Sequence, residues 1–293
     1  MNGRSLIAVA LVVFAVVTSA VAGGGLKVSH GTVAVDGGKL YYEAAGKGRP
    51  VVLIHGGQMD GRMWDEQFTL LAQSYRVIRY DVRGYGRSTV PTKPYSNVDD
   101  LDRLLTHLGV SRAVLVGLSL GGGISVDYAL VHPERVEALV LSGPGLSGYS
   151  WSPESVAGSW KIITAARDEG FARATELWLQ DPMMSAAMEN GRIAARVREL
   201  VSANEHVWLM NPFLERELKP PAAGRLAEIR APTLVLVGSR DVADIQRIGD
   251  LVAEQVPGAR KETVEGAAHI VNMEKPEEFN RLLLDFLAGS GSR

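Results

Sequence analysis

The sequence predicts an α/β fold, with a mostly parallel sheet of the eight-stranded type that helices cover on both faces. Two observations lead to this prediction. Short, wholly apolar runs typical of buried parallel strands recur along the 293 residues, and segments of helical character separate them. Hydrophobic residues make up 46% of the chain, so a core of ordinary size is available. The carboxyl ends of parallel strands meet at one edge of the sheet, where such folds bind ligands.

The elements follow one another in a regular order. Residues 27–35 and 39–45 alternate in polarity around Asp36-Gly37-Gly38, which predicts a hairpin. The apolar or strand-like runs that we expect to form the remaining strands are residues 51–54, 76–80, 113–116, 138–141, 233–237 and 260–264. The segments that we expect to form core helices are residues 63–72, 98–108, 124–131, 244–255 and 276–287. The last of these begins with Pro276 and two acidic residues, a typical helix start.

Residues 145–223 interrupt this order, because they contain no strand-like run and several prolines. We expect them to form a helical cap inserted into a core made of residues 26–144 and 224–288. The cap holds four of the five tryptophans and four methionines: Trp151, Trp160, Trp178, Trp208, Met183, Met184, Met188 and Met210. These side chains either pack as the cap's own core or roof an apolar pocket of adaptable shape.

The candidate nucleophile is Ser119. It is the central residue of Gly117-Leu118-Ser119-Leu120-Gly121, a G-x-S-x-G pattern that follows an apolar strand and precedes a helix. A sharp turn in this setting presents the serine hydroxyl above a helix N-terminus, whose dipole favours developing negative charge. The flanking glycines allow the helix to pass close to the strand.

The loop after residues 51–54 reads His55-Gly56-Gly57-Gln58 and is expected to face the nucleophile. An oxyanion hole needs one backbone N–H from such a loop and one from the residue after the nucleophile, so we assign Gly57 and Leu120. His55 is a possible base, but we expect it to hold the loop through hydrogen bonds, because the base comes last in this arrangement.

Serine needs a base, and six histidines are available. Only His269 both follows the serine and lies in a loop after a predicted strand. The orienting acid should also follow a strand and lie between the serine and His269, which selects Asp241. Asp244 is the alternative, although it is expected in the first turn of the next helix, where acids are favourable anyway.

Four stretches together resemble the α/β-hydrolase superfamily over nearly the whole chain. They are His55-Gly56-Gly57, the loop from Asp81 to Ser88 with its D-x-R-G-x-G-x-S pattern, Gly117 to Gly121, and Gly266-Ala267-Ala268-His269 followed by Glu274-Lys275-Pro276 and Phe279. The resemblance implies a serine hydrolase with a helical lid. Related epoxide hydrolases and haloalkane dehalogenases carry Asp where this chain has Ser119, which argues against both activities.

The expected reaction is hydrolysis of small to medium apolar carboxylic esters through an acyl-enzyme, in the manner of a carboxylesterase. A lactone hydrolase, a carbon–carbon bond hydrolase or a cofactor-free perhydrolase would use the same triad. The non-enzyme alternative is a hydrolase-like receptor, which would capture a ligand and turn it over barely or never. We expect no cofactor or metal. Gly84-Tyr85-Gly86 lacks the third glycine of a dinucleotide-binding fingerprint, because Thr89 stands in its place. The sequence also has no phosphate-binding loop, no pair of histidines at zinc-ligand spacing and no cysteine. The formal net charge of −2 argues against nucleic acid, and the oligomeric state is left open.

The N-terminus predicts export. Arg4 precedes an apolar run over residues 6–17, and Ala20-Val21-Ala22 then ends in small residues, as in a secretory signal peptide of residues 1–22 cleaved after Ala22. The run is short for a membrane span, although an uncleaved anchor is the alternative. The mature protein is therefore expected to be secreted or periplasmic, without a stable membrane span.

Overall fold

The computed structural model describes residues 26–290, and these residues confirm the predicted fold class. One eight-stranded sheet has the order β1-β2-β4-β3-β5-β6-β7-β8. Its strands are β1 (Val28–Val35), β2 (Gly38–Ala45), β3 (Pro50–Ile54), β4 (Arg76–Tyr80), β5 (Ala113–Leu118), β6 (Val136–Ser142), β7 (Thr233–Gly238) and β8 (Arg260–Val264). β2 runs antiparallel to both of its neighbours, and β4, β3 and β5 to β8 pair in parallel. The predicted signal peptide and its cleavage site lie outside the described residues.

Ten α-helices and several short 3-10 helices lie between residues 26 and 290. The α-helices are α1 (Asp65–Leu71), α2 (Asn97–His107), α3 (Leu120–Val131), α4 (Pro153–Asp168), α5 (Phe171–Leu179), α6 (Ser185–Glu189), α7 (Gly191–Ala203), α8 (Ala243–Gln255), α9 (Val271–Glu274) and α10 (Pro276–Ser290). The 3-10 helices are η1 (Gly61–Trp64), η2 (Pro133–Arg135), η3 (Pro182–Met184), η4 (Glu205–Leu209), η5 (Pro212–Leu214), η6 (Ala222–Gly224) and η7 (Leu226–Glu228). None of these helices combines the length and the apolar character that crossing a bilayer would require.

The apolar residues of the strands divide between two cores, one on each face of the sheet. Along β3, Val51 and Leu53 belong to one core, and Val52 and Ile54 belong to the other, as the alternation of side chains in a strand requires. Side chains of α1 and α10 pack into the first core, and those of α2, α3 and α8 pack into the second. Helices therefore cover both faces, which explains why the central strands β5 and β7 are buried at every position, whereas the edge strands β1 and β8 carry exposed polar residues.

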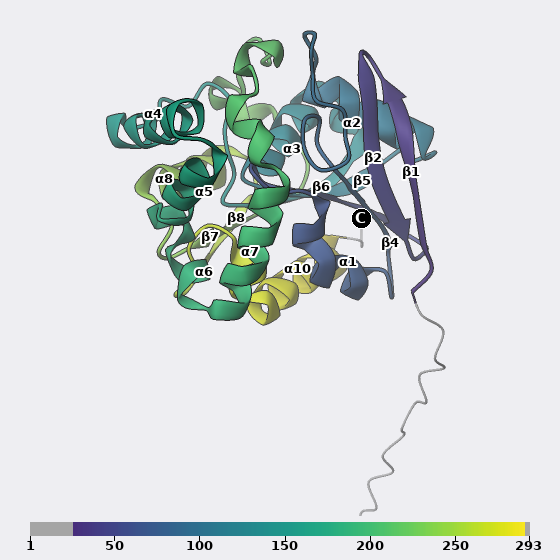
Figure 1. Ribbon diagram of the computed structural model, residues 1–293. Coiled ribbons are helices and arrows are strands. Elements are labelled where there is room, and N and C mark those ends of the chain that lie inside the picture. The colour runs from purple at the N-terminus through teal and green to yellow at the C-terminus, as the bar shows by residue number, and fades with distance from the viewer. Residues whose placement is uncertain (1–25, 291–293) are drawn as a thin grey trace, which may run out of the picture.

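The chain between β6 and β7 contains α4 to α7 and short 3-10 helices, where the sequence predicts a cap. Figure 1 shows these helices, in teal and green, on the side of the molecule away from the β1–β2 hairpin. Buried cap residues such as Ile162, Val197 and Leu200 join the same core as α1 and α10. The cap limits at residues 145 and 223 stay predictions.

Two expected helix boundaries were wrong. The helix expected at residues 63–72 begins instead as the 3-10 turn η1 and becomes α-helical only at Asp65. The helix expected from residue 124 begins at Leu120, directly after the candidate nucleophile. Three consecutive glycines lower the helix propensity of that turn, but tertiary packing leaves no room for a side chain on Gly121 or Gly122. A Cβ atom on Gly121 would lie 2.2 Å from the carbonyl oxygen of Ile54.

Candidate active site

Ser119 occupies a strained turn between β5 and α3. Its φ of 52° and ψ of −111° are rarely adopted by a residue with a side chain. Backbone hydrogen bonds hold the turn, since Ser119 donates to the carbonyl of Ser142 at 3.0 Å and accepts from Gly145 at 2.9 Å. A Cβ atom on Gly117 would lie 2.2 Å from the carbonyl oxygen of Gly121, so both glycines of the motif are needed for the strand and helix to approach.

Asp241 and His269 come together at the same edge of the sheet. Asp241 follows β7, His269 follows β8, and the His269 Nδ1 atom lies 2.8 Å from Asp241 Oδ2. The other carboxylate oxygen, Oδ1, accepts the backbone N–H of Val242 at 2.8 Å. The cap reaches this pair as well, because the backbone N–H of His269 donates to the carbonyl of Met183 at 3.2 Å. Imidazole and carboxylate are both buried.

The surroundings of His269 favour its charged form. Burial lowers the pKa of His269, but the charge and hydrogen bond of Asp241, with the charges of Glu274 and Asp181, outweigh burial and raise the pKa above 6.5. Glu274 is itself close by, and its Oε2 accepts the backbone N–H of Ala268 at 2.6 Å. Burial raises the pKa of Glu274 to about 7. The sequence motif around Glu274 marked it as part of the loop, but did not reveal its electrostatic effect on the imidazole.

Gly57 and Leu120, the predicted oxyanion donors, lie on the two segments that flank Ser119. Leu120 is the first residue of α3. The loop after β3 passes beside the nucleophile, since a Cβ atom on Gly56 would lie 3.5 Å from the Ser119 Cβ. The two segments are joined directly, because Gly121 donates its N–H to the carbonyl of His55 at 3.1 Å. Their use as oxyanion donors remains a proposal.

His55 holds this loop, as expected from the sequence. Its Nε2 accepts the backbone N–H of Val82 at 2.8 Å, and its Nδ1 lies 2.8 Å from the carbonyl oxygen of Gly56. Val82 can only donate, so the proton of the imidazole belongs on Nδ1. Burial lowers the pKa of His55 in spite of the nearby charge of Asp81, in agreement with a neutral ring. Both nitrogens are therefore engaged in positioning the backbone.

Asp244, the alternative acid, is engaged elsewhere. Its carboxylate accepts hydrogen bonds from the hydroxyls of Tyr149 at 3.0 Å, Ser152 at 2.7 Å and Ser155 at 2.5 Å. The hydrogen bonds of Ser155 and Ser152 lower the pKa of Asp244 to about 2. Asp244 belongs to α8 and thus anchors the start of α4 against that helix. Asp241 is the carboxylate that contacts the imidazole.

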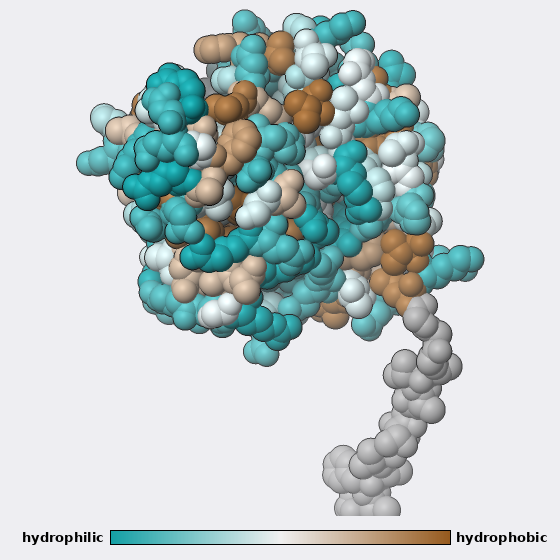
Figure 2. Space-filling model, in the orientation of Figure 1, coloured by the Kyte–Doolittle hydropathy of each residue, from teal (hydrophilic) through white to brown (hydrophobic). Residues whose placement is uncertain are grey.

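A cavity of about 590 Å³ lies between the cap and the sheet, and Ser119, His269 and Gly57 all line it. Trp151, Trp160 and Trp178 contribute to its wall, as do Met183 and Met184. In the orientation of Figure 2, brown hydrophobic side chains interrupt the teal surface beside α4 and α5.

The tryptophans and methionines of the cap therefore divide between the two roles that the sequence left open. Trp208 is buried and packs edge-on against Trp178, with 6.2 Å between ring centroids, so it belongs to the cap core.

The described lining of the cavity carries three carboxylates, those of Glu154, Asp181 and Asp244. It contains no lysine and no arginine.

Fold and site together define a hydrolase of the α/β type. A model of the alpha/beta hydrolase family matches residues 51–282, and the chain belongs to this family. A putative carbamate hydrolase, RutD, of Azorhizobium caulinodans is 32% identical over 251 residues, which are 84% of this chain and 94% of that protein. The enol-lactonase from Burkholderia xenovorans superimposes with a TM-score of 0.74 at 27% identity, over 88% of this chain and 100% of that one. A thermophilic esterase from Thermogutta terrifontis gives a TM-score of 0.73 at 26% identity, over 90% and 100%.

Proposed function

We propose that this protein is a serine hydrolase that cleaves neutral, apolar carboxylic esters through an acyl-enzyme, with Ser119, Asp241 and His269 as its catalytic triad. One observation carries the proposal. Ser119 and His269 line the same cavity, and His269 is hydrogen-bonded through Nδ1 to a buried carboxylate. This arrangement leaves Nε2 of the imidazole to act as the base.

The reaction follows from these positions. The Ser119 Oγ attacks the acyl carbon while its proton passes to His269 Nε2. The N–H groups of Gly57 and Leu120 stabilise the negative oxygen of the tetrahedral intermediate, each contributing about a hundredfold or more in turnover. When the intermediate collapses, the alcohol leaves with the proton from His269. Water then gives its proton to His269 and attacks the acyl-enzyme, which releases the acid and restores Ser119.

The lining of the cavity supports neutral substrates. Its walls carry three carboxylates and, among the described lining residues, no lysine or arginine, so a substrate carboxylate would enter against repulsion while His269 is neutral, as it must be to act as the base. Its apolar part includes Val156, Trp160 and Ile163, which share one face of α4. Hydrophobic acyl or alkyl groups fit this wall.

A fluorophosphonate probe tests the triad first. We expect one label on Ser119 and no label on a Ser119→Ala variant, whose turnover should fall about a millionfold. An unlabelled wild-type protein would instead indicate a ligand receptor. Matched p-nitrophenyl esters with a neutral or a carboxylate-terminated acyl chain test the charge preference, and we expect the neutral ester to have the higher kcat/KM. Faster turnover of the anionic ester would contradict the substrate assignment.

Lactones are the second candidate substrate, because the enol-lactonase shares this fold over its whole length. The same triad would open the ring, and the alcohol and acid would remain in one product. Hydrolysis of γ- and δ-lactones measured beside the linear esters decides between the two. Cleavage of vinylogous diketones tests the carbon–carbon bond hydrolase alternative. An assay of peracid formation tests the perhydrolase alternative.

The proposed compartment is the periplasm or the outside of the cell. Support comes from the charge, apolar run and small residues of positions 1–22. Mass spectrometry of the mature protein should find Gly23 as its first residue. An intact Met1 on the purified protein would contradict cleavage.

A further inference from the structure

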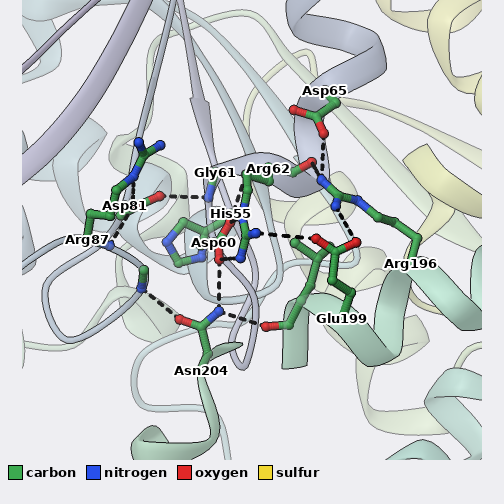
Figure 3. A network of polar contacts seen from close by, with 12 residues as sticks. His55, Asp60, Gly61, Arg62, Asp65, Asp81, Arg87, Arg196, Glu199 and Asn204 are labelled. Atoms are coloured by element: carbon green, nitrogen blue, oxygen red, sulfur yellow. Dashed lines mark hydrogen bonds and ion pairs between the residues drawn. The ribbon is translucent and has the colours of Figure 1, made fainter. Parts of the chain in front are cut away.

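Asn204 is a buried polar residue of the cap that follows α7 directly, and its side chain joins three segments. Its Nδ2 donates to Asp60 Oδ2 at 2.9 Å and to the carbonyl of Leu200 at 2.8 Å, and its Oδ1 accepts the backbone N–H of Gly86 at 2.7 Å. Figure 3 shows the amide between the carboxylate of Asp60 and the loop that carries Arg87. The side chain is 0% exposed, so these contacts fix its orientation.

Asp60, the partner of Asn204, is a buried anion that depends on these contacts. Arg62 donates to it from Nε at 2.8 Å and from a terminal guanidinium nitrogen at 2.7 Å. Burial raises the pKa of Asp60, but the hydrogen bonds of Arg62 and Asn204 outweigh burial and lower the pKa to about 2. Arg62 is only two residues away, so without Asn204 the Asp60 Oδ2 atom would keep a donor from its own segment and lose the one that ties it to the cap, and the carboxylate could then shift together with Arg62.

The position of Asp60 matters because it closes the proposed oxyanion loop. His55 holds the beginning of the loop through Val82, and Asp60 ends it, three residues after Gly57. Gln58, between them, has a φ of 59°, a strained value for a residue with a side chain. Asp81 adds a further tie by accepting the N–H of Gly61 at 2.9 Å. A loop under strain keeps its geometry only where both ends are held.

We propose that Asn204 is a positioning residue: by holding Asp60, the cap sets the backbone N–H of Gly57 in the place where it stabilises the oxyanion. The proposal rests on the proposed function and assigns to the cap a part in turnover, in addition to forming the cavity wall. Asn204 itself does not line that cavity. Its loss is therefore expected to affect the transition state and to leave the binding of substrate in the ground state almost unchanged.

The chain offers a matched control at the other end of the same helix. Asn190 precedes α7, and its Oδ1 accepts the backbone N–H groups of Arg192 at 3.1 Å and Ile193 at 3.3 Å. Asn190→Ala and Asn204→Ala both remove side-chain hydrogen bonds at an end of α7 and should both lower the melting temperature. Only Asn204→Ala removes the hydrogen bond that ties Asp60 to the cap, while the bonds from Arg62 to Asp60 remain.

The experiment compares both variants with the wild-type chain on a neutral ester and with two inhibitors. A trifluoromethyl ketone forms a tetrahedral adduct with Ser119 whose oxyanion occupies the hole, whereas the alcohol product binds without forming one. We expect Asn204→Ala to lower kcat about 10- to 100-fold, because alignment at the reacting centre is lost. The affinity for the trifluoromethyl ketone should fall by a similar factor. KM and the alcohol's inhibition constant should stay within about threefold of the wild-type values, because ground-state binding is unchanged. Asn190→Ala should leave all four constants within about threefold as well.

Several outcomes would overturn the positioning role. It fails if Asn204→Ala retains the wild-type kcat and ketone affinity, if its whole loss is in KM, or if Asn190→Ala loses kcat equally. Asn204→Ser replaces the alanine variant if the latter does not fold, and it should show a smaller loss in kcat and ketone affinity together. An error in the proposed function is distinguishable, because the wild-type protein itself would then neither hydrolyse the ester nor bind the ketone covalently.

Discussion

Replacing Asp241 with Asn tests the acid of the triad, and its effect can be worked out from two hydrogen bonds. Oδ1 of Asp241 accepts the N–H of Val242 at 2.8 Å, and Oδ2 faces His269 Nδ1 at 2.8 Å. In Asp241→Asn the amide oxygen must take the Oδ1 position, because Val242 can only donate. The NH₂ group then faces Nδ1 and forces it to accept. The imidazole proton moves to Nε2, which can no longer take the proton of Ser119.

The wrong tautomer costs serine proteases about 10⁴-fold in kcat, which corresponds to about 5.5 kcal/mol. We expect a loss of this order in Asp241→Asn, with KM within about threefold of the wild-type value. Steady-state kinetics on a p-nitrophenyl ester measures both constants, and thermal unfolding checks that the isosteric variant is folded.

Asp244→Asn is the matched control, since it removes the neighbouring carboxylate and leaves the imidazole untouched. Its hydroxyl partners Tyr149, Ser152 and Ser155 can rotate to suit an amide, so kcat should fall less than about tenfold. The reasoning is refuted if Asp241→Asn keeps more than about a tenth of wild-type kcat, or if Asp244→Asn loses more than Asp241→Asn does.

Four further predictions concern strain, protonation and substrate length. Ser119→Gly should melt a few degrees above Ser119→Ala. Glycine relieves about 1–3 kcal/mol of backbone strain in the folded state, which exceeds the roughly 0.4–1 kcal/mol by which its greater chain entropy stabilises the unfolded state. A lower melting temperature for Ser119→Gly would contradict the strain. The raised pKa of His269 predicts that kcat/KM rises with pH through a midpoint above 6.5, since the base must be neutral, and Glu274→Gln should move this midpoint to lower pH by removing a negative charge. Glu274 also has a pKa of about 7 in the fold against 4.5 when exposed, so it contributes a loss of stability as the pH rises from 4.5 to 7, and urea unfolding should show a smaller fall over this range in the Gln variant than in the wild-type protein. Trp160→Ala should lower kcat/KM for long-chain esters relative to short ones by an amount on the order of 1 kcal/mol, whereas the exposed Phe213→Ala, outside the cavity, should leave that ratio unchanged.

Most of the core could be predicted because its signals are local. A buried parallel strand needs an apolar run, and the expected strand at residues 233–237 corresponds to β7 at Thr233–Gly238. The strand ends then locate candidate site residues, since parallel strands converge at one edge. Asp241 and His269 were selected in this way, and the structure places them in hydrogen-bond contact. The start of α3 was mistaken because the requirement for Gly121 comes from Ile54, a residue far away in the sequence.

The contacts between cap and core had no comparable signal. An amphipathic pattern on α7 indicates which of its faces is buried, but not what it is buried against. Asn204 follows that helix as an ordinary polar residue, and its partners Asp60 and Gly86 are more than a hundred residues away. The same holds for the carbonyl of Met183, whose role depends on where η3 lies against the core and leaves no trace in the identity of the side chain. Long-range pairs of this kind need the fold before they can be recognised.

These contacts connect the cap to each part of the proposed site. Met183 accepts from the backbone of His269, Asn204 holds Asp60, and Asp244 binds the first turn of α4. A displacement of the cap would therefore move the base and the oxyanion loop as well as the wall of the cavity. It follows that substitutions at Trp160 or Val156, whose side chains line the cavity from α4 and make none of these contacts, can change substrate preference without loss of kcat. Exchange of the whole cap for that of a relative should lower kcat on every substrate, because the three contacts depend on residues of both parts.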